Sequence, residues 1–276
     1  MSFTFHRTYR GPLRAAIFDW AGTTVDFGCL APAGAFVNVL ARHGVMATDA
    51  QARSPMGMHK RDHIRAMLQL PELREQWTAR HDTPPTEADV ETLFQEFIPL
   101  QLEVLPQYCN VIPGVVEVVD SLRAQGMGIG ATTGYNAEMM QLCMEAALRA
   151  GYRPDVSVAV TEVPAGRPAP WMALKAAMHL NVYPPEALVK VGDTPVDVAE
   201  GLNAGMWTVA VVESGNEMGL SEADLAALRP ATRELCRRRA HEKLAQAGAH
   251  YVIDRIGQLP GIVAEINARL AQGEKP

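Results

Sequence analysis

The spacing of hydrophobic residues divides the chain into a helical stretch and a longer region in which strands and helices alternate. The apolar run 15–18 ends on Asp19 and breaks at once into a turn of glycine and threonine, as a buried parallel strand does. Apolar residues then recur at helical spacing from about residue 30 to residue 101. From Pro106 nearly to the end, strand patterns and helix patterns alternate.

Short connections between these segments predict a parallel sheet covered by helices on both faces. The pattern therefore predicts an α/β fold with a discontinuous Rossmann-like core, 1–27 and 106–276, and an inserted all-helical domain, 28–105. Helices are expected in the insertion at 30–43, 58–70, 72–80 and 86–100. In the core we expect strands at 15–19, 127–133, 156–161, 188–192, 208–212 and 251–255. Core helices are expected from 115 to 126 and at 137–150, 168–180, 196–204 and 260–270, with a polar helical excursion at 217–247.

The composition is that of an ordinary soluble globular protein and excludes several classes of function. Hydrophobic residues make up 48% of the 276 residues and charged residues 20%, which allows one or two large cores and argues against disorder. The net charge of −6 gives no basic surface to attract nucleic acid or an anionic membrane. The longest apolar stretches have the length of strands, too short to span a bilayer.

The N-terminus and the cysteines indicate a cytoplasmic protein. Residues 1–11 carry His6, Arg7 and Arg10 without the apolar region of a signal peptide. The four cysteines lie far apart without metal-ligand spacing, as expected of reduced thiols: Cys29, Cys109, Cys143 and Cys236.

Polar residues stand where four of the predicted strands end. Asp19 ends the first and Thr133 the second, Arg167 follows the third, and Asp193 and Asp197 follow the fourth. Each has a simpler explanation alone: Asp193 as a helix cap, Arg167 as a surface arginine, Thr133 as an ordinary β-branched strand residue. Because open parallel sheets bind ligands beyond the carboxyl ends of their strands, we expect these residues to share one site.

The residue types of this site point to phosphoryl transfer. Two carboxylates at neighbouring strand ends can share a hard cation such as Mg²⁺, which prefers oxygen ligands. Hydroxyl, backbone N–H and guanidinium groups then hold the oxygens of a phosphoryl group.

A lysine in the helical insertion offers a second chemistry. Met56, Lys60 and His63 share one face of a helix, and Ile64 and Met67 extend that face with apolar residues. Lys60 is either a solvated helix lysine or one that points at an enclosed surface. In the second case desolvation lowers its pKa, and the neutral amine can condense with an aldehyde.

The order of the strand-end residues resembles the four motifs of the haloacid dehalogenase superfamily, over nearly the whole chain. The helical insertion stands where that superfamily carries its cap domain. The resemblance implies that Asp19 attacks phosphorus and forms an aspartyl-phosphate, and that Thr133 and Arg167 bind the phosphoryl group. It also implies that Asp19 and Asp193 bind Mg²⁺, with Asp197 supporting the metal site.

One position departs from most phosphatases and phosphomutases of that superfamily. They carry an aspartate two residues after the nucleophile as general acid and base, and here that position is Ala21. Losing such a group typically removes ~10²–10⁴-fold in rate. Either the protein is weak or inactive, or its leaving group needs no proton from that place. Ala21 can still offer its backbone carbonyl to the metal.

The chain resembles the phosphonatase family, the phosphonoacetaldehyde hydrolases, in the stretches 19–26, 55–60 and Thr132-Thr133-Gly134-Tyr135. The resemblance implies cleavage of the C–P bond of phosphonoacetaldehyde to acetaldehyde and phosphate. Lys60 would form a Schiff base with the aldehyde, and this imine would accept the electrons of the leaving carbon, so Ala21 need not be an acid. Substrate-binding residues are then expected at Cys29, Met56, Thr133, Gly134, Tyr135 and Arg167, and His63 is expected to assist proton transfers or to position Lys60.

Other interpretations stay open at this point. A phosphatase or phosphomutase acting on a sugar phosphate would use Lys60 only as a contact. A catalytically inactive relative would sense phosphate or act as a scaffold, a view that Ala21 invites and the retained acidic residues oppose. His63 could be a surface histidine, and Cys29 a buried cysteine without a role. The family resemblance also suggests a small-molecule phosphonate substrate and a homodimer with helix 30–43 as its contact.

Overall fold

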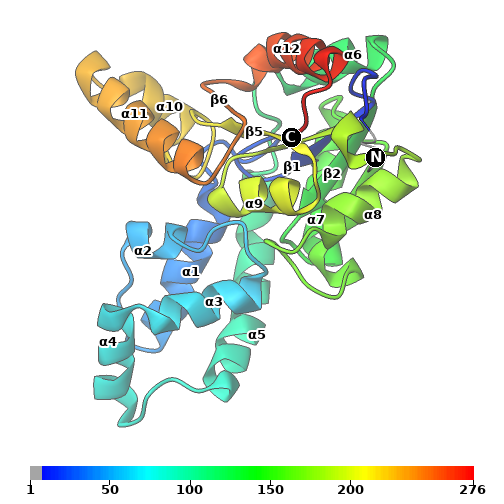
Figure 1. Cartoon of the computed structure of the whole chain (residues 1–276). Coiled ribbons are helices and arrows are strands. Elements are labelled where there is room, and N and C mark those ends of the chain that lie inside the picture. The colour runs from blue at the N-terminus through cyan, green and yellow to red at the C-terminus, as the bar shows by residue number, and fades with distance from the viewer. Residues whose placement is uncertain (1–7) are drawn as a thin grey trace, which may run out of the picture.

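Six parallel strands form the centre of the molecule, which a computed structural model describes from residue 8 to residue 276 (Figure 1). Their order in the sheet is β3-β2-β1-β4-β5-β6. The strands are β1 Ala15–Asp19, β2 Gly128–Thr133, β3 Val156–Ala159, β4 Leu188–Gly192, β5 Trp207–Val211 and β6 Tyr251–Ile253. The predicted α/β fold with a Rossmann-like parallel sheet is thus confirmed.

Helices cover both faces of this sheet. The core helices are α6 Val115–Ala124, α7 Ala137–Arg149, α8 Trp171–His179, α9 Pro195–Asn203, α10 Glu222–Ala227, α11 Pro230–Gln246 and α12 Leu259–Gln272. Successive residues of β1 pack on opposite faces, because side chains alternate along a strand. Ala16 and Phe18 face the core shared with α6 and α12, whereas Ala15 and Ile17 face α8. Figure 1 shows α6 and α12 side by side on one side of the sheet.

Between β1 and α6 the chain folds into helices that lie together below the sheet in Figure 1, and we call this part the cap. Its helices are α1 Leu30–Arg42, α2 Asp49–Arg53, α3 Lys60–Gln69, α4 Pro71–His81 and α5 Glu87–Val104. Short 3₁₀ helices complete the described elements at Leu105–Gln107, Val160–Glu162, Pro185–Ala187 and Ile256–Gln258. The division into a core of 1–27 and 106–276 and a cap of 28–105 stays a prediction.

Several element boundaries differ from the prediction, each for a local reason. The helix expected from 168 begins at Trp171, since prolines at 168 and 170 lack the N–H that a helix interior needs. The strand expected to reach 161 ends at Ala159, where a 3₁₀ turn begins. Helix α2 was not expected, because five residues are too few to show a helical period; Thr48 and Gln51 form a capping box at its start.

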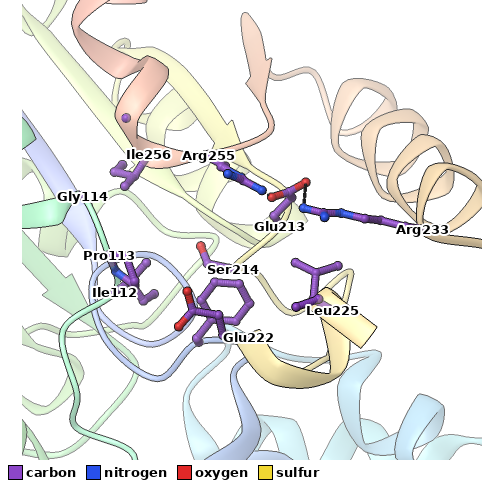
Figure 2. A pocket seen from close by; sticks show the side chains of 13 residues that line it. Ile112, Pro113, Gly114, Glu213, Ser214, Glu222, Leu225, Arg233, Arg255 and Ile256 are labelled. Atoms are coloured by element: carbon purple, nitrogen blue, oxygen red, sulfur yellow. Dashed lines mark hydrogen bonds and ion pairs between the residues drawn. The ribbon is translucent and has the colours of Figure 1, made fainter. Parts of the chain in front are cut away.

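The polar excursion after β5 forms one wall of a cavity near both connections between core and cap. The cavity has a volume of about 390 Å³, and Figure 2 shows Glu213 paired with Arg233 beside it. Phe27 from the first connection and Pro113 from the second also line it. The excursion therefore packs against the segments that join the two parts of the chain.

Two expectations concern the ends of the chain and membranes. No helix of residues 8–276 is long and apolar enough to cross a membrane. The expectation that residues 1–11 form no signal peptide falls mostly on residues 1–7, which lie outside the described residues.

Asp26 fixes the start of α1 and gives the fold a pH dependence. Its carboxylate accepts hydrogen bonds from the backbone N–H groups of Leu30 (3.0 Å) and Ala31 (3.1 Å). Burial raises the pKa of Asp26 to about 7 in spite of these bonds. The unfolded chain releases this proton near the ordinary pKa of about 3.9. The contribution of Asp26 to stability is therefore full below about pH 4 and is lost as the pH rises to about 7.

We expect Asp26→Asn to remove this pH dependence, because an amide does not titrate. We compare the free energy of unfolding of the unmodified protein with that of the variant. The difference, unmodified protein minus variant, should fall between pH 4 and pH 7 and stay constant above pH 7. Urea titrations at a series of pH values measure both. A difference that does not change with pH would contradict the assignment.

Candidate active site

Three carboxylates meet at the carboxyl edge of the sheet. Asp19 ends β1, Asp193 follows β4, which is the neighbour of β1, and Asp197 lies in the first turn of α9. All three are buried, and each offers an oxygen within 4.8 Å of the others. The helix cap of α9 is Thr194, whose hydroxyl accepts from the Asp197 N–H, so Asp193 is free of the capping role.

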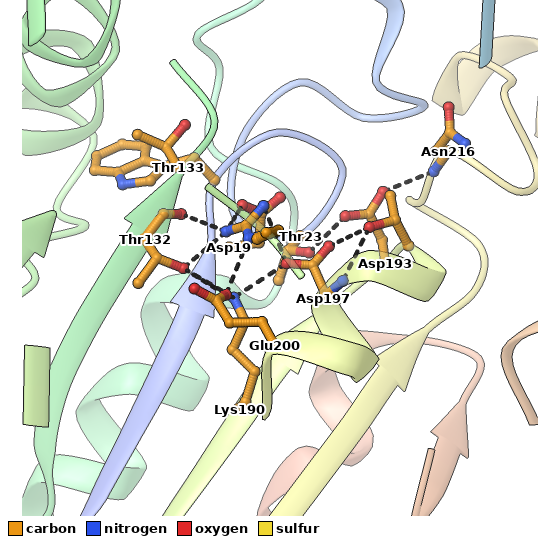
Figure 3. A network of polar contacts seen from close by, with 12 residues as sticks. Asp19, Thr23, Thr132, Thr133, Lys190, Asp193, Asp197, Glu200 and Asn216 are labelled. Carbon is orange, nitrogen blue, oxygen red and sulfur yellow. Dashed lines mark hydrogen bonds and ion pairs between the residues drawn. The ribbon is translucent and has the colours of Figure 1, made fainter. Parts of the chain in front are cut away.

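Two buried cations, Arg167 and Lys190, hold the other side of this cluster, and Figure 3 shows Lys190 beside Asp197 and Glu200. The Arg167 guanidinium donates to Asp19 Oδ1 (2.6 Å) and to Glu200 Oε2 (2.9 Å). The Lys190 ammonium lies 3.1 Å from both Asp197 Oδ1 and Glu200 Oε2. The Arg167 guanidinium thus contacts an Asp19 oxygen directly. The sequence predicts Arg167 as a phosphoryl-binding residue.

The cluster has more negative than positive groups. Four buried carboxylates, Asp19, Asp193, Asp197 and Glu200, face the cations of Arg167 and Lys190. Two negative charges stay uncompensated when all are ionised, which is the charge of one divalent cation.

The raised pKa values of Asp19 and Asp193 are consistent with this excess of negative charge. Burial and the neighbouring charges of Asp19 and Asp197 raise the pKa of Asp193 well above its ordinary value. Burial also raises the pKa of Asp19 to about 6, although Arg167 opposes the shift. The carboxylates therefore fit a site for a hard divalent cation, which would relieve their repulsion.

Lys60 of the cap lies against the same site with a buried amine. It is 5% exposed, so it is not a solvated helix lysine. Its Nζ lies 5.0 Å from the centre of the Tyr135 ring and 5.5 Å from that of Phe36. Among residues 8–276 it makes no hydrogen bond or ion pair, in contrast to Lys190. Burial lowers the pKa of Lys60, although the nearby Cys29 and Asp19 favour its charged form.

Most of the predicted site residues line one small cavity between cap and core. Its volume is only about 20 Å³, so the cap packs against the core here with little space between them. The predicted residues on its wall are Asp19, Ala21, Cys29, Met56, Lys60, Thr133, Gly134, Tyr135 and Arg167, joined by Pro32, Gly57 and Thr194. Asp193 and Asp197 lie behind this wall.

The close approach of the cap depends on Gly57, in the loop before α3. Gly57 has φ +88°, and a Cβ there would stand 2.5 Å from Val196 and 2.6 Å from the Thr194 hydroxyl. Only glycine combines this left-handed conformation with so near a neighbour. Met56 therefore lies in this loop and not on a helix face with Lys60 and His63 as predicted, because α3 begins only at Lys60 and the left-handed Gly57 interrupts any helix before it.

His63 lies behind Lys60 and is not on the wall of the cavity. It is fully buried, which rules out a surface histidine, and its ring stacks on Phe36 with centroids 3.6 Å apart. Its Nε2 donates to the Ala52 carbonyl (2.8 Å), and its Nδ1 has no partner within the described part of the chain. Burial and the Lys60 charge lower the pKa of His63 well below its ordinary value, so the ring is neutral.

Some residues of the site were missed from the sequence. Lys190 and Glu200 complete the charge cluster, and Thr132 accepts from Lys190 (2.9 Å) and from Arg167 (2.7 Å). A lone lysine inside the apolar run Leu188–Gly192 was the available signal, because a buried lysine needs a partner. The second signal was the position of Glu200, which follows Asp197 by three residues and lies on the same face of the helix.

Comparison with known proteins agrees with this fold. The family model for haloacid dehalogenase-like hydrolases matches residues 13–205. The fold and the strand-end carboxylates thus define a hydrolase of the haloacid dehalogenase superfamily.

More similar proteins identify the family within this superfamily. Phosphonoacetaldehyde hydrolase of Nitratidesulfovibrio vulgaris is 47% identical over 98% of this chain and 96% of its own length. That of Hahella chejuensis is 45% identical over 100% and 94%. The crystal structure of a phosphonoacetaldehyde hydrolase-like protein from Oleispira antarctica superposes with a TM-score of 0.97 at 43% identity, covering 100% of both chains. The chain belongs to the phosphonoacetaldehyde hydrolase family.

We expect Mg²⁺ to stabilise the protein, because it would relieve the repulsion within the acidic cluster. At a concentration 100 times its dissociation constant, a ligand that binds only the folded state adds about 2.7 kcal/mol. Thermal melts with Mg²⁺ and with EDTA measure the effect.

The Asp193→Asn variant supplies the control for this measurement. It removes one buried charge, so it should melt higher than the unmodified protein in EDTA and gain little from Mg²⁺. Equal Mg²⁺ shifts in the two proteins would contradict a cation site at Asp193.

Proposed function

We propose that this chain hydrolyses the C–P bond of phosphonoacetaldehyde, giving acetaldehyde and phosphate. The observation that carries the proposal is the buried amine of Lys60, which is free of ion pairs among the described residues and shares a cavity with the carboxylate of Asp19. An amine and a carboxylate nucleophile in one closed cavity suit a substrate with an aldehyde at one end and phosphorus at the other. The names of the relatives support the same substrate.

Lys60 performs the first step. Its neutral amine adds to the aldehyde carbon, and loss of one water gives an imine, which takes up a proton. The ring faces of Tyr135 and Phe36 exclude water around this nitrogen. The protonated imine is then positioned to accept the electrons of the C–P bond.

Asp19 performs the second step. Its carboxylate attacks phosphorus while the C–P bond breaks, and the bonding electrons move into an enamine on Lys60. The enamine takes a proton on carbon, and water hydrolyses the resulting imine to acetaldehyde and the free amine. A further water hydrolyses the aspartyl-phosphate and returns Asp19. The C–P cleavage requires no acid at Ala21, because its leaving group is a carbon whose electrons the imine accepts.

Side chains around Asp19 bind the phosphonyl oxygens. Arg167 already contacts Asp19 and stands beside the attacking oxygen. Thr133 and Gly134 line the cavity at the end of β2. Asp19 and Asp193, with the Ala21 carbonyl, would hold Mg²⁺, and Asp197 would support them through its contact with Arg167 (3.1 Å). Bound Mg²⁺ supplies a positive charge that lessens repulsion between the carboxylate and the anionic substrate.

The remaining residues shape the aldehyde end of the cavity. Cys29, Met56 and Tyr135 are nearly fully buried on its wall and would pack around the imine. His63 would position Lys60 from behind, since its ring is held by Ala52 and Phe36. We also propose a cytoplasmic homodimer that uses α1 as its contact.

Replacing Lys60 tests the imine. Lys60→Arg keeps the positive charge but should reduce release of phosphate from phosphonoacetaldehyde to the background rate, because a guanidinium does not form the imine. Lys175→Arg, at a partly exposed lysine paired with Glu162, is the matched control and should keep full activity. Turnover by Lys60→Arg at the rate of the control would refute the proposal.

The same assay separates two other functions. Fast release of phosphate from phosphomonoesters, unaffected by Lys60→Arg, would identify a phosphatase or phosphomutase. No turnover of either substrate class, with no beryllium fluoride adduct on Asp19, would identify an inactive phosphate-binding relative.

The pH dependence of imine formation follows from the burial of Lys60. The reactive amine is the neutral form, so the rate of reductive trapping by cyanoborohydride should rise with pH. Since burial lowers the pKa of Lys60, the midpoint should lie below the ordinary lysine value of about 10.4. A midpoint at that ordinary value would show that the amine reacts from a solvated state.

A further inference from the structure

Two polar side chains connect the cap to the core beside the acidic cluster. Arg53 is the last residue of α2 in the cap, and Asn216 lies in the core loop after β5. Both are shielded from water: the side chain of Arg53 is 11% exposed, and Asn216 is 3% exposed. The proposed chemistry uses neither of them.

The two residues bind each other reciprocally. Arg53 Nη1 donates to Asn216 Oδ1 (3.3 Å), and Asn216 Nδ2 donates to the Arg53 carbonyl (3.2 Å). The same Nη1 also donates to the carbonyls of Gly28 (2.8 Å) and Cys29 (3.3 Å). One guanidinium therefore holds together a cap helix, a core loop and the connection between β1 and α1.

That connection has an unusual backbone. Asp26, Gly28 and Cys29 have φ of 54°, 88° and 52°, so three of four successive residues are left-handed. The Gly28 N–H donates to the Ser214 carbonyl (2.7 Å), and a Cβ on Gly28 would stand 2.2 Å from the Leu220 carbonyl oxygen. The connection is thus seated on the same core loop that carries Asn216, and its left-handed conformation has to be held there by its surroundings.

Asn216 also reaches the acidic cluster. Its backbone N–H donates to Asp193 Oδ2 (2.8 Å), the contact drawn at the right of Figure 3. The other oxygen of Asp193 accepts from the Thr23 hydroxyl (3.0 Å). A continuous path of contacts therefore runs from Asp193 through Asn216 and Arg53 to the connection at Gly28.

We propose that Arg53 and Asn216 are positioning residues that couple cation binding at Asp193 to closure of the cap. A cation bound at Asp193 would fix the orientation of this carboxylate and, through its contact with the Asn216 N–H, the loop at Asn216. The loop would then present the acceptor that Arg53 needs to hold the connection in place. Because such coupling is reciprocal, a closed cap must also tighten cation binding. The inference rests on the proposed function in one respect, namely that closure of the cap serves to bring Lys60 to the substrate.

Hydrogen exchange tests the coupling without any substrate. In the unmodified protein, Mg²⁺ should slow exchange of the backbone amides at 28–31 relative to EDTA. Asn216→Ala keeps the backbone N–H that binds Asp193 but removes the link to Arg53, so the protein should still bind Mg²⁺ yet lose this protection. Its affinity for Mg²⁺ should fall by about tenfold, within the usual range of coupling between two sites.

Three further variants make the result decisive. Arg53→Ala should have the same effect as Asn216→Ala, and the double variant should be no worse than either, since both remove one path. Asp49→Asn, which weakens only the ion pair of Arg53 with the exposed Asp49, should behave as the unmodified protein.

Two outcomes would overturn the proposal. The first is that Mg²⁺ still protects the amides of residues 28–31 in Asn216→Ala and Arg53→Ala. The second is that Mg²⁺ gives no such protection in the unmodified protein, although thermal melts show that it binds. Neither readout involves turnover, so failure of the coupling is distinct from failure of the proposed reaction. If the chain cleaves phosphonoacetaldehyde, both variants should lower kcat/KM, because an open cap holds Lys60 away from the substrate.

Discussion

Uncompensated negative charge buried at the carboxyl edge of the sheet is the constraint on which the rest of the structure depends. Parallel strands end there side by side, so Asp19 and Asp193 come together with their α9 neighbours in a place that water does not reach. Such a cluster is stable only with cations around it. Arg167 and Lys190 provide two of the positive charges that the four carboxylates need. The two negative charges that stay uncompensated explain why the site fits a divalent cation.

Two buried lysines near this edge have opposite surroundings, and this contrast supports the proposed chemistry. Lys190 is held between Asp197 and Glu200, with its Nζ 3.1 Å from a carboxylate oxygen of each. Lys60 stands against aromatic rings, where burial lowers its pKa. The core thus keeps one lysine as a structural cation, whereas the cap delivers the other as an amine that can be neutral. A closed cap is necessary for that difference, because a lysine on an open helix would be solvated.

The fold and much of the site could be predicted from the sequence, because strand ends in a parallel sheet converge on one edge wherever they lie along the chain. The positions of Asp19, Thr133 and Arg167 at or after strand ends are enough to predict that they lie together. The same rule does not place Lys60, whose orientation depends on the rings of Phe36 and Tyr135 from distant segments. Contacts between single side chains at helix ends and on loops, such as Arg53 with Asn216, follow no period, and for that reason the sequence does not predict them.

The most direct test of the account is to locate the amine that bonds to the substrate. The protein is incubated with phosphonoacetaldehyde and borohydride, and the modified residue is identified by peptide mass spectrometry. The account predicts irreversible inactivation with one modification, on Lys60, and none on Lys190, although Lys190 is equally buried and close to Asp19. Modification of Lys190, or full activity after treatment with no modified lysine, would contradict it.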